Sequence, residues 1–280
     1  MLLNMDFDMN LKITLLASLI LLSCSHGKNK NRPLPGSLEE AVNSSARAEE
    51  NSDRDEYQHP AETLQFFGIK PEMTVVEISP GAGFYTEILA PYLSQLGQYV
   101  IAVPRLPSNP PAFMLENEQK LQDILLRHRE VQAKTSFVPF EPLNEKNRTK
   151  HSFADMVITF SSVHNWVAND SADESFKFFH DILKPNGILG LVQHRISEKK
   201  KNLPKSGYMT EREVITLARK NGFKLAGRSV INANPLDTAD YPDGVWTLPP
   251  TYRLGEKDRD RYEDIGESDR MTLKFIRIGK

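Results

Sequence analysis

The residues best suited to chemistry in this sequence form a glycine-rich turn, Pro80-Gly81-Ala82-Gly83. The turn follows an apolar, β-branched run, Met73 to Ile78, and precedes apolar residues that recur at helical spacing from Phe84 to Leu93. This order predicts a buried strand, a turn and a helix. Ligands of open α/β sheets bind at the carboxyl ends of the strands, where Gly81 and Gly83 let a ligand approach the backbone. An ordinary tight turn is the alternative.

Glu77 lies just before this turn and indicates the charge of a ligand there. A carboxylate at the end of the strand would repel the pyrophosphate of a dinucleotide and attract a cation that carries an ammonium or sulfonium group. Thr86 also occupies the position where the dinucleotide fingerprint has a third Gly or Ala. An NAD-dependent oxidoreductase is therefore disfavoured.

Two histidines are candidate catalytic residues, because each follows a predicted strand. His164 comes after the strand 154–160, and His194 comes directly after the strand 188–193. Histidines on neighbouring strand ends can place a general base near neutral pKa, although each alone is more often a hydrogen-bonded structural residue. Tyr57 and His59 are candidates to reach over the same edge, with a packed aromatic ring and a surface histidine as the alternatives.

A metal site is disfavoured. His164 and His194 could converge with Asp237, Asp240 and Asp243, but the sequence has neither a Cys pair nor a His-x-x-His spacing.

Seven predicted strands carry these residues. They cover 73–78, 98–103, 134–140, 154–160, 188–193, 223–231 and 271–278, and the helices cover 61–67, 84–93, 111–131 and 171–183, with another opening at Thr210 in a capping box with Glu213. The first five strands alternate with helices, which predicts a parallel sheet with right-handed crossovers. The last two have no helix between them and fit an antiparallel pair at one edge.

The stretch 232–268 is too long for a plain connection. It is rich in proline and contains Trp246. We expect a cover that folds over the site and selects the substrate, or a decoration packed on the edge of the sheet.

The amino-terminal residues predict export. Lys12 precedes an apolar run, 13–22, that is too short to span a bilayer and suits a signal peptide, and it ends in Leu21-Leu22-Ser23-Cys24. We expect a lipoprotein-type signal over 1–23, a disordered tether over 24–52 and one domain over 53–280. The mature protein would be periplasmic and held on a membrane through lipidated Cys24. The alternative is a buried amphipathic helix in which Cys24 is a small apolar residue.

The charge pattern argues against nucleic-acid binding. The net charge is −2 with both signs interspersed, and the only basic run is Lys199-Lys200-Lys201. Cys24 is the only cysteine, so an internal disulfide is impossible.

Three motifs resemble those of class I S-adenosylmethionine-dependent methyltransferases: VVEISPGAG, FADMVITF and LKPNGILGL. Longer phrases, such as ETLQFFGIKPEMTVVEI and NPLDTADYPDGVWTLPP, look closer to a group of bacterial predicted methyltransferases whose substrate is not defined. The resemblance implies a Rossmann-like seven-stranded α/β fold, mostly parallel with an antiparallel last strand. It also implies S-adenosylmethionine as cofactor and a small-molecule substrate.

The resemblance assigns cofactor-binding roles to Glu77, Ser79, Gly81 and Gly83. We expect Tyr57 to bind the cofactor too, because it could reach over the ligand edge of the sheet. Ser79 replaces the first glycine of the motif. Pro104 stands where the family usually has the acid that binds the ribose, while Glu141 matches a position near the adenine amino group. The leading hypothesis is a methyltransferase, and the alternative is a non-catalytic ligand-binding lipoprotein that keeps the fold.

Overall fold

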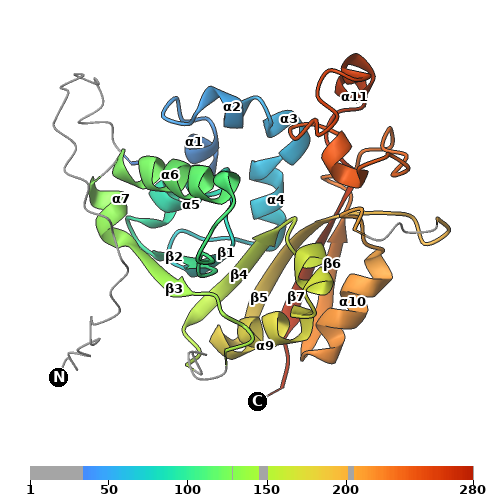
Figure 1. Ribbon diagram of the computed structural model, residues 1–280. Coiled ribbons are helices and arrows are strands. Elements are labelled where there is room, and N and C mark those ends of the chain that lie inside the picture. The colour runs from blue at the N-terminus through green and yellow to red at the C-terminus, as the bar shows by residue number, and fades with distance from the viewer. Residues whose placement is uncertain (1–33, 128, 145–150, 201–204, 280) are drawn as a thin grey trace, which may run out of the picture. The chain divides into compact units, whose positions relative to one another are not determined.

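Seven strands form one sheet in the order β3-β2-β1-β4-β5-β7-β6 (Figure 1). The computed structural model describes residues 34–127, 129–144, 151–200 and 205–279. The strands are β1 Thr74–Ile78, β2 Gln98–Val103, β3 Thr135–Pro139, β4 Ala154–Phe160, β5 Leu183–His194, β6 Phe223–Ser229 and β7 Arg270–Arg277. The first five strands pair in parallel, and β7 runs antiparallel to β5 and β6. The predicted fold class is therefore confirmed.

The final strand does not lie at the edge of the sheet. The predicted antiparallel pair is present, but β7 lies between β5 and β6, so β6 forms the edge. Met271, Leu273 and Phe275 share one face of β7 and are fully buried in the core that contains α9 and α10.

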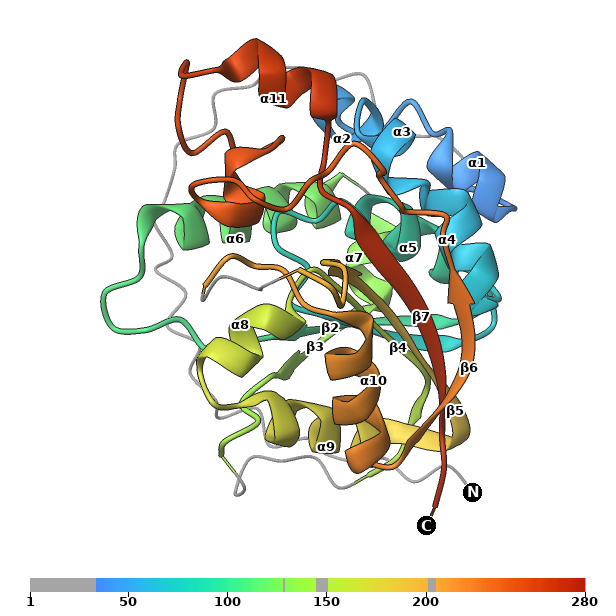
Figure 2. The ribbon, with the colours of Figure 1, turned by 90° about the vertical axis from the view of Figure 1, so that its right-hand side faces the viewer.

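Helices cover both faces of the sheet (Figures 1 and 2). One apolar core joins the sheet to α1 Leu38–Val42, α4 Pro60–Phe67, α5 Thr86–Leu93 and α6 Ala112–Leu126. The other joins it to α8 Val163–Ala168, α9 Ala172–Ile182 and α10 Glu211–Lys220. The remaining helical elements are α2 Glu49–Ser52, α3 Asp55–Gln58, α7 Arg129–Lys134, η1 Gly244–Thr247 and α11 Arg259–Ile265.

Local signals predicted the start of α10 but not the bounds of α6, α7 and β5. The capping box of Thr210 and Glu213 opens α10 as expected. The helix expected over 111–131 is instead two helices, α6 and α7. The breaker at 184–187 lies within the bounds of β5, where the pairing with β4 shifts register between Ala154 and Met156.

The expected disordered tether is wrong for residues 34–52, which form α1 and α2 against the domain. Leu38, Ala41 and Val42 are buried in the same core as α5, and the backbone N–H of Ala48 donates to the carboxylate of Glu87 at 3.2 Å. Three apolar residues at helical spacing and hydrogen bonds to Glu87 therefore hold this otherwise polar segment on the domain. The expected signal peptide and Cys24 lie outside the described residues. Within the described part, no helix is long and apolar enough to cross a membrane.

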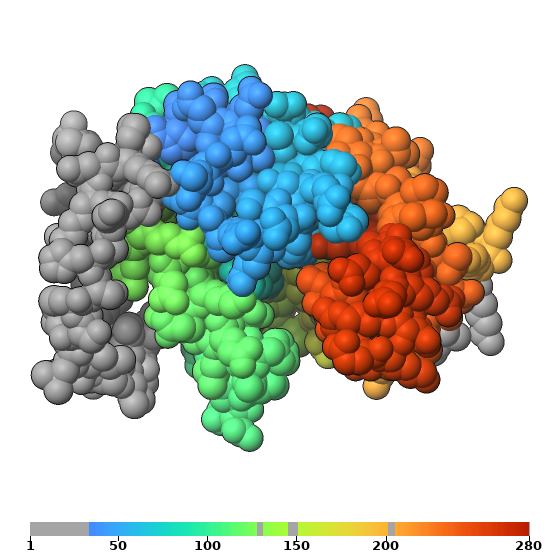
Figure 3. Space-filling model, turned by 90° about the horizontal axis from the view of Figure 1, so that it is seen from above, coloured from blue at the N-terminus to red at the C-terminus, as the bar shows by residue number. Residues whose placement is uncertain are grey.

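The segment from Asn232 to Ser268, called the cover segment below, contains η1 and α11. Figure 2 shows it beside the end of the sheet at which β7 begins. From above, the N-terminal helices, the stretch around α6 and the red end of the cover segment surround a hollow (Figure 3).

Candidate functional site

The turn after β1 uses its two glycines in different ways. Gly81 is exposed at φ +60°, and a Cβ added to it would meet no atom within 4 Å. Gly83 is buried at φ +89°, and a Cβ there would lie 2.5 Å from Cδ1 of Ile124 in α6. Gly81 therefore leaves space in which a ligand can approach the backbone, whereas Gly83 is needed for the packing of α6. Ser79 also has a positive φ, +53°.

Glu77 lies beneath the turn rather than at the surface. Glu77 is only 1% exposed. Its carboxylate accepts hydrogen bonds from the hydroxyls of Tyr99 and Thr86, the latter at 3.1 Å. Burial raises the pKa of Glu77 to about 7, although these two bonds oppose the rise. The sequence suggested that Glu77 contacts a cationic ligand directly. Its buried position favours a structural role beneath the turn instead. Thr86, which the sequence marked only as a departure from the dinucleotide-binding fingerprint, donates one of the hydrogen bonds to Glu77.

The ends of β2 and β3 carry an ion pair. The guanidinium of Arg105, next to Pro104, lies 2.8 Å from the carboxylate of Glu141. Asn144 Nδ2 donates to the same carboxylate at 3.1 Å. Glu141 thus stands at the edge where the resemblance placed it, but it is already partnered by a cation.

The two candidate histidines meet, as expected from their strand ends. The ring centroids of His164, on α8, and His194, at the end of β5, are 5.6 Å apart. Nδ1 of His164 is 3.1 Å from Nε2 of Gln193, and Nδ1 of His194 is 2.6 Å from the hydroxyl of Ser268. Burial lowers the pKa of His164. Burial, with His164 and Arg270 nearby, lowers the pKa of His194 well below its usual range. In both rings, burial therefore favours the neutral form.

The cover segment contacts both histidines. The ring of Trp246 meets that of His164 edge-on, with centroids 5.7 Å apart, and Ser268 bonds His194. Asp237 accepts from the Tyr208 hydroxyl and from the backbone N–H of Asp269. These contacts favour a cover over the site rather than a remote decoration.

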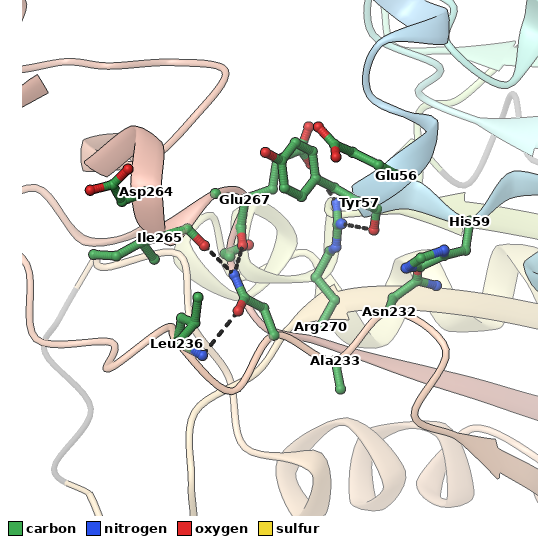
Figure 4. A pocket seen from close by; sticks show the side chains of 13 residues that line it. Glu56, Tyr57, His59, Asn232, Ala233, Leu236, Asp264, Ile265, Glu267 and Arg270 are labelled. Carbon is green, nitrogen blue, oxygen red and sulfur yellow. Dashed lines mark hydrogen bonds and ion pairs between the residues drawn. The ribbon is translucent and has the colours of Figure 1, made fainter. Parts of the chain in front are cut away.

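A cavity of about 260 Å³ lies between the α3–α4 junction and the cover segment (Figure 4). Tyr57 and His59 line it from the junction of α3 and α4, and the two ends of the cover segment complete it together with Arg270 of β7. Ser268 both lines the cavity and bonds His194. Tyr57, which the sequence predicts to bind the cofactor, is one of the residues that line this cavity.

A buried ionic cluster holds α3 against this cavity. Glu267, 4% exposed, accepts from Arg54 at 2.6 Å, from Gln58 at 2.5 Å and from Arg270 at 2.8 Å. Arg270 also donates to the backbone oxygen of Tyr57 at 2.6 Å (Figure 4). Sequence analysis missed these residues, because nothing in the local pattern relates Arg54 to a glutamate more than two hundred positions later.

The acidic residues of the cover segment do not assemble a metal site. Among the described residues, no group of three or more His, Cys, Asp or Glu side chains could hold an ion. Asp237 is occupied by Tyr208 and backbone donors.

No family model and no curated protein matches this chain. Solved structures do. A SAM dependent methyltransferase from Aquifex aeolicus has 15% identity and a TM-score of 0.51, over 89% of this chain and 100% of that one. The [4+2]-cyclase SpnF has 12% identity and a TM-score of 0.54, over 85% and 86%. An O-methyltransferase family protein from Burkholderia thailandensis has 14% identity and a TM-score of 0.50, over 89% and 65%. At these identities the likeness establishes the fold, which is that of class I methyltransferases.

Proposed function

We propose that this protein is an S-adenosylmethionine-dependent methyltransferase that acts on a small molecule. One arrangement supports this proposal. An open glycine turn after β1 and a pair of histidines, His164 after β4 and His194 at the end of β5, lie at the same edge of the sheet. This is the edge at which ligands of open α/β sheets bind.

The residues at the turn fit such a cofactor. Gly81 leaves its backbone open to a ligand, and Ser79 shares the left-handed conformation that shapes the turn. S-adenosylmethionine supplies a methyl group on a sulfonium that is already a good leaving group. The protein then has to orient the acceptor, exclude water and manage one proton.

The acceptor is expected in the cavity that Ser268 lines. Its volume of about 260 Å³ lies just below the ~300–1,000 Å³ typical of ligand sites, so the acceptor is small. Tyr57 and His59 would contact it, and Ser268 connects it to His194.

Calorimetric titration with S-adenosylmethionine, S-adenosylhomocysteine and NAD tests the proposal. We expect saturable binding of the first two and none of NAD. Gly81→Val should abolish binding, because the new side chain fills the open space beside the turn. Gly255→Val is its matched control, since Gly255 has φ +62° and also faces no atom within 4 Å. Folded wild-type protein that binds neither S-adenosyl compound would refute the proposal.

The second candidate function is ligand binding without catalysis. Pro104 stands where such enzymes usually have the acid that binds the ribose. Nearby, the carboxylate of Glu141 is paired with Arg105. The cyclase among the structural neighbours also shows that this fold carries reactions other than methyl transfer. Binding of the S-adenosyl compounds without methyl transfer to any acceptor would favour this candidate.

The proposed membrane attachment rests on the sequence alone. Stable anchoring needs more than one acyl chain, which lipoprotein processing at Cys24 would supply. Cys24→Ala should release the protein from membranes or leave it unprocessed. Unchanged mass and fractionation would refute this part.

A further inference from the structure

The side-chain amide of Gln193 has only one orientation compatible with its surroundings. Gln193 is fully buried. Its Oε1 accepts from the backbone N–H of Val163 at 3.1 Å, and its Nε2 donates to the backbone oxygen of Gly207 at 3.0 Å. A flipped amide would set donor against donor at Val163 and acceptor against acceptor at Gly207. These backbone groups have fixed polarity, so they settle the orientation.

This orientation fixes the proton of His164. Nε2 of Gln193 is also 3.1 Å from Nδ1 of His164, and an amide nitrogen can only donate. Nδ1 therefore keeps its lone pair, and the neutral ring carries its proton on Nε2. Protonating Nδ1 would place two donors face to face, so the contact with Gln193 stabilises the neutral ring.

His194 is held differently. Its Nδ1 faces the hydroxyl of Ser268 at 2.6 Å, and a hydroxyl can donate or accept. When Nε2 of His194 takes up a proton, Nδ1–H can donate to Ser268 with no hydrogen bond lost. Among the described residues, the rings of His164 and Tyr208 lie against this ring, and the nearby charge of Arg270 opposes its protonation.

We propose that Gln193 is a positioning residue that keeps His164 a permanent Nε2–H donor. This inference rests on the proposed function and gives the two histidines different roles. His164 can donate a hydrogen bond to a ligand from Nε2 but cannot take up a proton at Nδ1, whereas the hydroxyl of Ser268 lets His194 adopt either tautomer.

Nitrogen-15 NMR of histidine-labelled, ligand-free protein tests the tautomer directly, with His164→Gln and His194→Gln used to assign the signals. We expect His164 at pH 7 to carry its proton on Nε2 alone. Gln193→Met should remove this restriction and raise the pKa of His164 by about one unit, the equivalent of one net hydrogen bond. Gln98→Met, at an exposed glutamine of β2, should leave His164 unchanged.

A proton on Nδ1 of His164, or an unchanged His164 pKa in folded Gln193→Met protein, would overturn the assignment. If that variant does not fold, the wild-type tautomer alone decides. The test uses no cofactor, so it can fail while calorimetry still supports the methyltransferase, and the reverse also holds.

Discussion

The turn after β1 and the histidine pair after β4 and β5 lie at the same edge of the sheet, but they are held in different ways. The turn is supported from beneath by buried groups: Gly83 packs against α6, and the carboxylate of Glu77 accepts hydrogen bonds from Tyr99 and Thr86. The histidine rings are held at Nδ1 by hydrogen bonds with Gln193 and Ser268. Changes beneath the turn should therefore affect stability, and changes beside the histidines should affect proton position.

The largest effect is expected at Gly83. Gly83→Val should lower the free energy of unfolding by about 4 kcal/mol, because left-handed backbone costs an L-residue ~1–2 kcal/mol and overpacking against Ile124 adds ~1–3 kcal/mol. Gly81→Val has the same backbone strain without the clash, so it should cost about 2 kcal/mol. Urea unfolding of both variants measures the difference. Equal losses would show that Gly83 is not fixed by packing.

Next in size is the pH dependence due to Glu77. Its pKa is about 7 in the folded protein against an ordinary value of 4.5, so the folded state favours the protonated form. Its contribution is fully present below pH 4.5 and is lost as pH rises through 7, a change of about 3 kcal/mol. Glu77→Gln has no such titration. Subtracting its unfolding free energies from those of the wild type across pH 4 to 8 isolates the effect, and parallel curves would contradict it.

The smallest effect is expected beside His194. Ser268→Ala removes the partner of Nδ1 and should cost about 1 kcal/mol of unfolding free energy. His194 would then lose its preferred proton acceptor, while His164 should keep its tautomer, because Gln193 is untouched. Ser197→Ala, at an exposed serine, should change neither. A changed His164 tautomer in Ser268→Ala would mean that the two rings are not held independently.

The two glycines and Glu77 show how far a local pattern can be followed. The sequence predicted a strand, turn and helix, and the structure has them at nearly the same bounds. The roles within the motif were not predictable. Gly81 and Gly83 are alike in the sequence, and only the position of Ile124, forty-one residues after Gly83, makes one open and the other closed.

The histidine pair was predictable for a different reason. Parallel strands place their carboxyl ends at one edge, so two histidines that follow β4 and β5 must come close once the strands are recognised. Their difference was hidden, because it depends on an amide whose backbone partners, Val163 and Gly207, lie on either side in the sequence and meet only after folding.

By itself, the sequence determined the alternation of strands and helices, the glycine turn and the cap of α10, because these follow from periodicity and from contacts within a few residues. Tertiary structure decided which polar groups lose water and what replaces it. Glu77 accepts a hydrogen bond from Tyr99, and Glu267 accepts hydrogen bonds from Arg54 and Arg270. The segment 34–52 packs on α5 instead of forming a free tether. Burial sets the cost of each unpaired group, and burial is a property of the whole fold.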